Sequence, residues 1–350
     1  MKRALRRFLR RRGATDTEID NAEEHGYLAL LVLDREILPG ERKYTMRDLA
    51  ERAGTDIDTA RTVWRAIGFP DLADDLRAFT DGDVGALRAL VHRVESGSIF
   101  EWSLQRALPQ ARVLSSALAR VADAETDDFA SSIELARRSG LGDEELALLL
   151  ARRLDFREIA ELIDHAHRIQ LRAAIWRRLA GTEPGTPATI DGGIGFVDLV
   201  GYTALSNVLE PEQLGELVTH FGELAHDTAA RQGGRIVKTI GDEVMFVTES
   251  ATVGAAIAVE LVERSAADEM LPAVRAGVAF GPLLAREGDY FGPVVNLASR
   301  LTEIARPGQV LASAELVAGL VPAVGIAPRR SFSRRIRDIG RVEIFRLERR

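Results

Sequence analysis

The sequence predicts two domains: an all-α N-terminal domain of residues 1–180, then an α+β domain of residues 194–350 whose helices pack on a mostly antiparallel sheet. Leu, Ala and Ile recur at three- and four-residue spacing through the first part, as in amphipathic helices. In the second part, short apolar segments of strand character alternate with helical ones. Residues 181–193, GTEPGTPATIDGG, are rich in Gly, Pro and Thr and predict a linker between the domains.

The composition is that of a folded, water-soluble chain of 350 residues, with 46% hydrophobic and 28% charged residues. No apolar run approaches the roughly 20 residues that a membrane span needs. The absence of Cys excludes disulfides and thiolate metal sites and fits a cytoplasmic protein. The net charge of −7 argues against a chain that binds nucleic acid nonspecifically.

The first twelve residues contain seven Lys or Arg, with Leu5, Phe8 and Leu9 at helical spacing. A basic amphipathic helix of this kind can lie on anionic lipid. Three apolar anchors are few for that purpose, so we expect the helix to pack on the rest of the chain instead of making a peripheral membrane contact.

Residues 44–71 resemble a helix-turn-helix, with the turn at Ala53-Gly54-Thr55. Asp56 and Asp58 stand at the start of the second helix, where a DNA reader places groups that approach phosphates and base edges. Their negative charge disfavours DNA binding. The segment is therefore interpreted as part of a structural or regulatory helical bundle.

The C-terminal domain is expected to follow the order strand, helix, hairpin, helix, strand, with the helices on one face of the sheet. Glu210-Pro211 opens the first helix and Gly233-Gly234 closes it. The expected elements are a strand at 194–200, a hairpin at 235–247, a second helix at 251–267 and a further strand at 273–285.

Two aspartates of this domain are candidates for a metal site. Asp198 interrupts the apolar segment IGFVDLV, where an unpaired carboxylate is costly to bury, and Asp242 lies at the tip of the hairpin KTIGDEVMFV. Carboxylates without nearby His or Cys favour Mg²⁺ or Mn²⁺ over Zn²⁺. The Gly-containing turn LVGYTALS after Asp198 has free N–H groups suited to phosphate. The alternative is a pair of unrelated surface aspartates.

A second cluster lies in GDYFGPVVNLASR, residues 288–300. Asn296 and Arg300 are four residues apart at the start of a predicted helix and so share a face, and Asp289 lies on the approaching strand or turn. An Arg is the usual stabiliser of charge on a transferring phosphoryl group. The alternative for any single Arg is an ordinary salt bridge on a helix surface.

The segments FVDLVGYTALS, KTIGDEVMFV and GDYFGPVVNLASRL resemble, in order and spacing, the three signature blocks of class III nucleotidyl cyclases. The resemblance covers roughly residues 190–350. It implies that Asp198 and Asp242, together with Leu199, bind two Mg²⁺ or Mn²⁺ ions per active site.

The resemblance also implies how ATP is bound. Lys238 and Asp289 would read adenine, because Lys donates to N1 and Asp accepts from the N6 amino group, whereas guanine-specific relatives carry Glu and a small residue such as Cys. Asn296 would orient the ribose, and Arg300 would stabilise the pentavalent transition state. The residues that would contact the triphosphate are Gly201, Tyr202, Thr203 and, as the cation of a late strand, Arg337.

The products implied are 3′,5′-cyclic AMP and pyrophosphate, formed by in-line attack of the ribose 3′ oxygen on the α-phosphorus. Lys238 and Asp242 are too close in sequence to serve one site from opposite sides. In the family, one subunit supplies the metal carboxylates and its two-fold mate supplies the purine, ribose and Arg groups. The resemblance therefore implies a homodimer with two equivalent sites.

Diguanylate cyclases are a rival interpretation, because they also carry a Gly-Asp/Glu-Glu sequence at a hairpin tip. Here the tip reads Ile240-Gly241-Asp242-Glu243-Val244 and not Gly-Gly-Asp/Glu-Glu-Phe. Diguanylate cyclases also lack the block that contains Asp289, Asn296 and Arg300. The pattern therefore disfavours this rival.

The N-terminal half resembles, less closely, that of soluble bacterial adenylyl cyclases whose helical domain is autoinhibitory and responds to acid pH; fatty-acid responsiveness also occurs among them. His165 and His167, just before the linker, are candidates for a pH switch because imidazole titrates in the right range. The alternative function is a weak or silent cyclase-like protein whose N-terminal half binds DNA.

Overall fold

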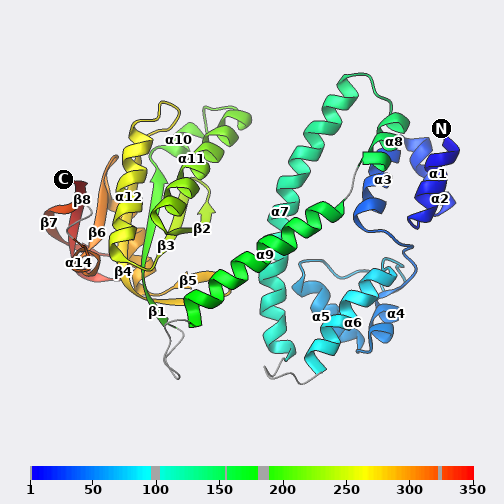
Figure 1. The fold of residues 1–350 in the computed structure, drawn as a ribbon, viewed down its shortest axis with the longest axis horizontal. Coiled ribbons are helices and arrows are strands. Elements are labelled where there is room, and N and C mark those ends of the chain that lie inside the picture. Colours follow the sequence, from blue (N-terminus) through cyan, green and yellow to red (C-terminus); the bar gives the residue numbers. More distant parts are fainter. Residues whose placement is uncertain (1, 96–102, 154–155, 180–188, 322–324) are drawn as a thin grey trace. The chain divides into compact units, whose positions relative to one another are not determined.

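The computed structural model describes residues 2–95, 103–153, 156–179, 189–321 and 325–350. The chain divides into two compact units, residues 1–182 and 183–350 (Figure 1). The first is helical and the second contains a large sheet with helices, which is the fold class that the sequence predicts. Each unit is considered separately.

The N-terminal unit contains two hydrophobic cores. One is built from the first three helices together with the helix that starts at Asp143, and the other is formed mainly by the three helices after Thr45. The helices are α1 (Lys2–Arg11), α2 (Asp16–His25), α3 (Leu28–Ile37), α4 (Met46–Ala53), α5 (Ile57–Ala66), α6 (Asp81–Glu95), α7 (Leu104–Arg138), α8 (Asp143–Arg153) and α9 (Phe156–Leu179).

Helix α1 packs on the rest of its unit, as the sequence analysis favoured. Leu5 and Leu9 are buried and belong to the first core, while Phe8 is partly buried against it. The apolar stripe that could have faced lipid is therefore used in the protein interior. Arg6 on the polar side forms an ion pair of 2.5 Å with Asp20 of α2.

The helix-turn-helix-like segment consists of α4 and α5. Gly54 ends α4 in the left-handed conformation, with φ of 83°. The Asp56 side chain caps α5 by accepting a hydrogen bond of 2.7 Å from the backbone N–H of Thr59. The carboxylate that disfavoured DNA binding thus has a structural role at a helix start.

The C-terminal unit alternates strands and helices. Helix α11 begins at the predicted Glu210-Pro211 start and ends before Gly233. The elements are β1 (Thr189–Leu199), α10 (Tyr202–Leu205), α11 (Pro211–Gln232), β2 (Arg235–Ile240), β3 (Glu243–Thr248), α12 (Ala251–Ala266), β4 (Val274–Arg286), β5 (Asp289–Phe291), α13 (Pro293–Ile304), β6 (Val310–Ser313), α14 (Ala314–Ala318), β7 (Ile326–Ile336) and β8 (Gly340–Arg349).

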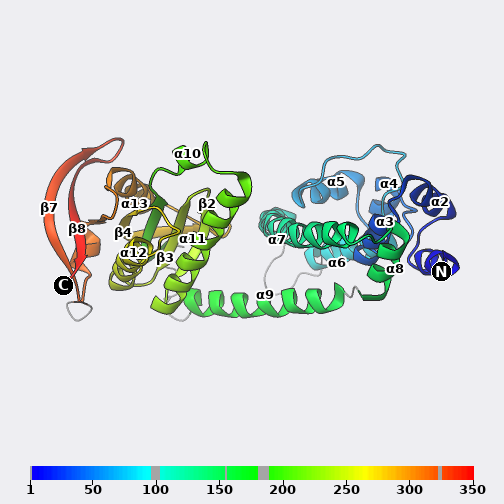
Figure 2. The same cartoon turned by 90° about the horizontal axis from the view of Figure 1, so that it is seen from above.

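The strands form one sheet in the order β2-β3-β1-β4-β6-β8-β7, with β5 paired to β4. Every pairing is antiparallel except that of β4 with β6. β7 and β8 form a long curved hairpin at one edge (Figure 2). Strand β1 lies between β3 and β4, so a residue of β1 has neighbours from two parts of the chain that are distant in sequence.

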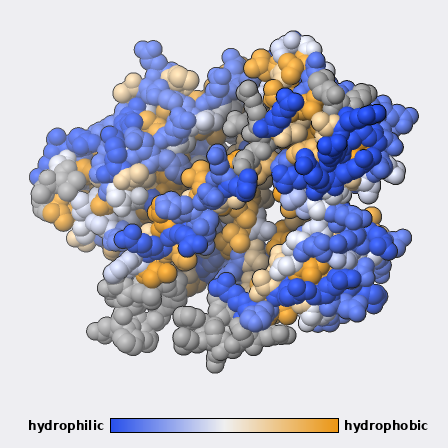
Figure 3. All heavy atoms as spheres, turned by 45° about the vertical axis from the view of Figure 1, so that its right-hand side comes forward, coloured by the Kyte–Doolittle hydropathy of each residue, from blue (hydrophilic) through white to orange (hydrophobic). Residues whose placement is uncertain are grey.

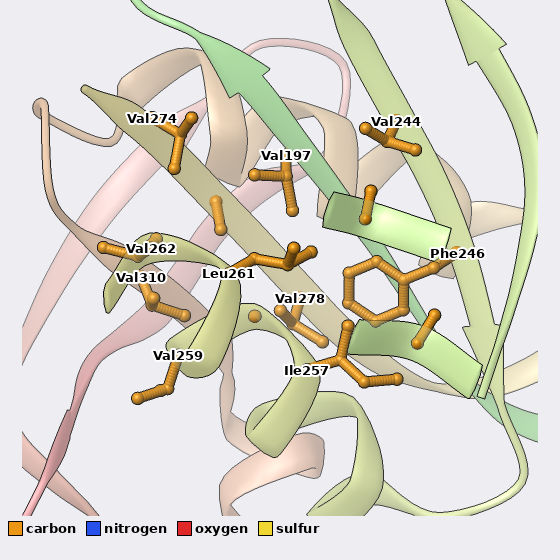
Figure 4. Close-up of a cluster of buried hydrophobic side chains, with 14 of the residues drawn as sticks. Val197, Val244, Phe246, Ile257, Val259, Leu261, Val262, Val274, Val278 and Val310 are labelled. Carbon is orange, nitrogen blue, oxygen red and sulfur yellow. The ribbon is translucent and has the colours of Figure 1, made fainter. Parts of the chain in front are cut away.

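Helices cover both faces of the sheet, which corrects the expectation that they lie on one face. Side chains of α11 and α12 bury one face together with Val197 and Phe246 (Figure 4). Helix α13 packs on the opposite face, where Ala298 joins the cluster of Ile194 and Phe196. Successive residues of a strand point to opposite faces, so the apolar runs IGFV of β1 and VMFV of β3 place apolar side chains on both sides of the sheet.

The close approach of α13 to β4 depends on a glycine. A Cβ atom at Gly277 would lie 2.3 Å from the backbone nitrogen of Thr302 and 2.4 Å from the carbonyl oxygen of Ala298. Any larger residue would push α13 away from the sheet. This contact fixes the position of the helix that carries Asn296 and Arg300.

The linker predicted at 181–193 is too long at its C-terminal end. Residues 189–193 belong to β1, where Gly192 pairs with Gly281 and Gly193 with Thr248 and Phe280. The glycines that suggested a linker serve instead in a crowded strand, since a Cβ at Gly193 would lie 2.5 Å from the Thr248 hydroxyl. Residues 180–188 lie outside the described residues.

The part of the chain that the structure describes contains no helix long and apolar enough to cross a membrane. The face shown in Figure 3 has hydrophobic residues scattered among hydrophilic ones.

Candidate active site

Asp198 and Asp242 lie side by side at one end of the sheet. Asp198 is on β1 and pairs in register with Glu243, the first residue of β3. Asp242 precedes that strand in the tight β2–β3 turn, next to Gly241 with φ of 61°. The backbone N–H of Leu199 donates to the carbonyl oxygen of Asp242 at 3.3 Å, which holds the turn against β1.

The carboxyl groups at this end of the sheet crowd one another. Burial, and then the charge of Asp198, raise the pKa of Asp242 above its usual range. Burial and the charges of Asp198 and Asp242 raise the pKa of Glu243 to about 7. Like charges at close range disfavour ionisation unless a cation is present. The site is therefore electrostatically suited to positive charge.

The donor set fits Mg²⁺ or Mn²⁺. These ions prefer oxygen ligands and are commonly held by one or two protein carboxylates, with phosphates and water completing the shell. Asp198 and Asp242 supply the carboxylates. Leu199 has a buried apolar side chain, so its backbone carbonyl is the one oxygen that it could offer. Within the described residues, no group of three or more His, Asp or Glu side chains is arranged for a metal, so an ion here would need further ligands from the substrate.

Asp198 also has a cationic partner that the sequence analysis did not identify. Arg275 of β4, its register neighbour, donates from Nε to Asp198 Oδ2 at 2.7 Å, and its Nη2 lies 2.6 Å from the same oxygen. Its Nη1 donates to the carbonyl oxygen of Glu303 at 3.1 Å. The available signal was an Arg inside the apolar strand segment AVRAGVAF, which is costly to bury without a counter-charge.

Lys238 and Asp289 form an ion pair although they are 51 residues apart. Lys238 is on β2, and Asp289 begins β5. The other Asp289 oxygen accepts from the N–H of Tyr290 at 2.8 Å. The Tyr290 hydroxyl in turn accepts from Arg235 at 2.8 Å. Both charged side chains remain partly exposed, at 40% for Lys238 and 28% for Asp289, so a ligand can reach them.

Asn296 and Arg300 lie one turn apart on α13, as predicted. Arg300 Nη1 donates to both carboxylate oxygens of Glu303, at 2.6 and 2.8 Å. This hydrogen bond, with the Glu303 charge, raises the pKa of Arg300, and the charge of Asp338 adds to the effect. The Arg300 side chain is 41% exposed. It is thus a fixed cation with access to solvent.

Gly201, Tyr202 and Thr203 follow directly after β1. Gly201 has φ of 82° and precedes the short helix α10, and Tyr202 packs partly against the core. The carbonyl oxygen of Thr203 accepts from the Asn207 amide at 2.8 Å, which closes the turn. The three residues therefore form an ordered turn next to the carboxylates.

Arg337 lies in the turn between β7 and β8 and is 89% exposed, with Asp338 at 3.6 Å as its ion-pair partner. No described contact within one chain joins it to Asp198, Lys238 or Arg300, and its role toward the triphosphate stays a prediction. His165 and His167 of α9 are both exposed, and no described hydrogen bond or ion pair involves either imidazole.

Comparison with known proteins gives concordant matches. The model of the adenylate and guanylate cyclase catalytic domain matches residues 191–343. The chain is 39% identical over 281 residues to an adenylate cyclase of Streptomyces coelicolor, covering 80% of this chain and 72% of that protein. It is 36% identical over 299 residues to an adenylate cyclase of Glutamicibacter nicotianae, covering 81% and 73%. A pH-sensitive adenylate cyclase of Mycobacterium tuberculosis is 30% identical over 342 residues, covering 91% and 82%.

Proposed function

The chain belongs to the class III nucleotidyl cyclases, and from this premise we propose that it is an adenylate cyclase that converts ATP to 3′,5′-cyclic AMP and pyrophosphate. The observation that carries the proposal is the Lys238–Asp289 pair, which two distant segments bring together. A Lys donor beside an Asp acceptor matches adenine, whose N1 accepts and whose N6 amino group donates. Guanine presents the opposite pattern at these positions. The adenylate cyclases among the relatives agree with this choice.

Divalent cations, when bound by Asp198, Asp242 and the Leu199 carbonyl, would lower the pKa of the ribose 3′-OH and neutralise charge on the phosphates. Asn296, exposed on α13, would hold the ribose by its amide so that the 3′ oxygen faces the α-phosphorus. Arg300 would leave Glu303 and donate to the oxygens on which charge develops.

The site is proposed to form between two subunits. Within one chain, the carboxylates of Asp198 and Asp242 lie where β1 ends and β3 begins. No described contact links these carboxylates to Lys238 or Asn296. A two-fold dimer would place the metal carboxylates of one chain opposite the purine and ribose residues of its mate and would create two equivalent sites. The partners proposed for this chain are therefore ATP and a second copy.

The direct test is to incubate the protein with Mn²⁺ and each nucleoside triphosphate and to identify cyclic products by chromatography. We expect ATP to give cyclic AMP and GTP to react far more slowly, since guanine would leave the Lys238 donor and the Asp289 acceptor without matching partners. Equal conversion of GTP would reject the adenine assignment. A lack of any cyclic product would reject cyclase activity.

The N-terminal helical unit is proposed to inhibit the catalytic unit in a pH-dependent way. A relative that matches 91% of this chain is described as a pH-sensitive adenylate cyclase, and His165 and His167 provide imidazoles just before residues 180–188. Residues 186–350 alone should be more active near neutral pH than the full chain, and acidification should narrow the gap. Equal activity of both from pH 5 to 8 would exclude this regulation.

A further inference from the structure

The ion pair of Lys238 with Asp289 joins two strands that are not neighbours in the sheet. Strand β2 pairs with β3 at one edge, whereas β5 pairs with β4, and β3 and β1 lie between β2 and β4. Within the described strands, no ladder of backbone hydrogen bonds therefore joins β2 to β5. Side chains must set the spacing between the two residues proposed to read the purine.

A β-bulge in β2 determines which face of the sheet its charged side chains occupy. The register of β2 against β3 shifts at Val237. Arg235 is paired with Val247, and Lys238 is paired with Met245, two residues earlier on β3. In a regular strand, residues three apart would point to opposite faces, but the extra residue places both cations on one face. That face is the one covered by α13, where Met245 and Val247 are buried.

Tyr290 of β5 makes a second connection to β2. Its ring packs, as Val237 does, against the buried cluster on this face. Its hydroxyl accepts a hydrogen bond of 2.8 Å from Nη2 of Arg235, and the guanidinium carbon lies 5.6 Å from the centre of the ring. Its backbone N–H donates to Oδ1 of Asp289 at 2.8 Å, while Oδ2 contacts Lys238. Tyr290 therefore holds the Asp289 carboxylate and is itself fixed to β2.

This second connection matters because adenine would compete for the first. In the proposed complex, Lys238 donates to N1 of adenine and Asp289 accepts from the N6 amino group, so their mutual ion pair alone does not set their spacing. Among the described residues, the Arg235–Tyr290 contact is the one other hydrogen bond between side chains of β2 and β5. Groups that recognise a ligand keep their geometry when packed and hydrogen-bonded neighbours support them.

We propose that Arg235 and Tyr290 are positioning residues for adenine recognition: they keep the Asp289 acceptor beside the Lys238 donor when the base is bound. The inference rests on the proposed adenylate cyclase function. The competing role is purely structural, in which the contact stabilises β5 without affecting the choice of base. The two roles differ in one measurable quantity, the preference for adenine over guanine.

This preference is measured as the ratio of the Kd values of 3′-deoxy-GTP and 3′-deoxy-ATP, which lack the attacking hydroxyl, by calorimetry on the full chain with Mn²⁺. Tyr290→Phe keeps the ring and loses the acceptor, and Arg235→Met loses the donor. Each should raise the Kd of 3′-deoxy-ATP by about tenfold, as expected for one hydrogen bond to a charged group, and leave that of 3′-deoxy-GTP unchanged. Arg235→Lys keeps a cationic donor and should recover part of the preference.

Two further variants serve as controls. Arg235→Met combined with Tyr290→Phe should be no worse than either single change, because both break the same contact. Arg231→Met removes an Arg that forms an ion pair with Glu260, between the helices α11 and α12 on the opposite face of the sheet. It should leave the ratio of Kd values as in the parent.

An unchanged ratio in folded Tyr290→Phe and Arg235→Met, or an equal loss of affinity for both nucleotides, overturns the proposal. Far-ultraviolet circular dichroism verifies the fold, and either variant decides the question if the other unfolds. Lys238→Ala is measured in parallel. If it keeps the preference of the parent, or if the parent has none, the adenine assignment itself is wrong, which is a different failure.

Discussion

The candidate site of the C-terminal unit and the helix-turn-helix-like segment of the N-terminal unit use their charged residues in different ways. In the C-terminal unit, the interactions that build the candidate site join residues far apart in sequence, such as Lys238 with Asp289 and Asp198 with Arg275, which is 77 residues away. In the helix-turn-helix-like segment of the N-terminal unit, Asp56 instead caps α5 through Thr59, three residues on. Charged residues that several strands bring together are typical of a functional site. Charged residues that cap the helix in which they lie stabilise that helix.

The largest effect that tests this contrast is expected from Asp198→Ala or Asp242→Ala. Each removes a proposed metal ligand from the sheet end without opening a core cavity, so cyclic AMP formation should fall by about 10³-fold, equivalent to about 4 kcal/mol. The measurement is product chromatography with Mg²⁺, with circular dichroism to verify the fold. Asp191→Ala, an exposed position on the same strand, is the control. Full activity of either ligand variant would rule out the metal assignment.

The next effect concerns the purine pair. Lys238→Glu combined with Asp289→Cys removes a donor and an acceptor, and hydrogen bonds that involve charged groups contribute about 1.5–3 kcal/mol each. The kcat/KM for ATP should therefore fall by about 10²-fold or more. Thr239→Glu, which adds a carboxylate to the neighbouring position on β2, should change it little. If the double variant cyclises ATP as well as the parent, these residues do not read adenine.

A smaller but more diagnostic result is expected from mixed dimers. Asp198→Ala damages the metal half of a site and Arg300→Ala damages the transition-state half, so each homodimer should be almost inactive. A mixed dimer would have one site with both lesions and one with neither. With random exchange of equal amounts, roughly a quarter of the parent activity should return. Co-expression of the two variants tests this, and no recovery despite demonstrated exchange would place both lesions in one subunit's site.

The smallest effect is expected in the N-terminal unit. Asp56→Ala removes the cap of α5 and should lower the stability of that unit by about 1 kcal/mol. Thermal unfolding followed by circular dichroism measures the change, and Asp75→Ala in the neighbouring exposed loop is the control. The N-terminal half should give no salt-sensitive mobility shift with DNA. A shift that strengthens in Asp56→Ala would instead favour the DNA-binding alternative.

Much of the candidate site could be proposed from the sequence because its residue types are unusual for their local context. Asp198 within an apolar strand and Asp242 in a glycine turn were visible from spacing alone, and the three blocks together identified the family. Arg337 stays a prediction: its segment contains several arginines, no local feature selects one of them, and the structure places this one in an exposed turn. Arg275 interrupts an apolar strand segment, but its partner Asp198 lies 77 residues away, and no local pattern relates the two.

The sequence by itself determined that the N-terminal half is helical and that the C-terminal half contains both strands and helices. It also determined the β2–β3 hairpin and the start of α11. These features depend on the periodicity of apolar residues and on residues that are close together in sequence. Only the tertiary structure decided that β1 extends back to Thr189, that α13 covers the second face of the sheet, and that Arg275 meets Asp198. These features depend on strand register and on a close approach at Gly277, where backbone atoms of α13 occupy the space that a side chain would need. Such contacts join segments that no local pattern relates, so they exist only once the sheet is assembled.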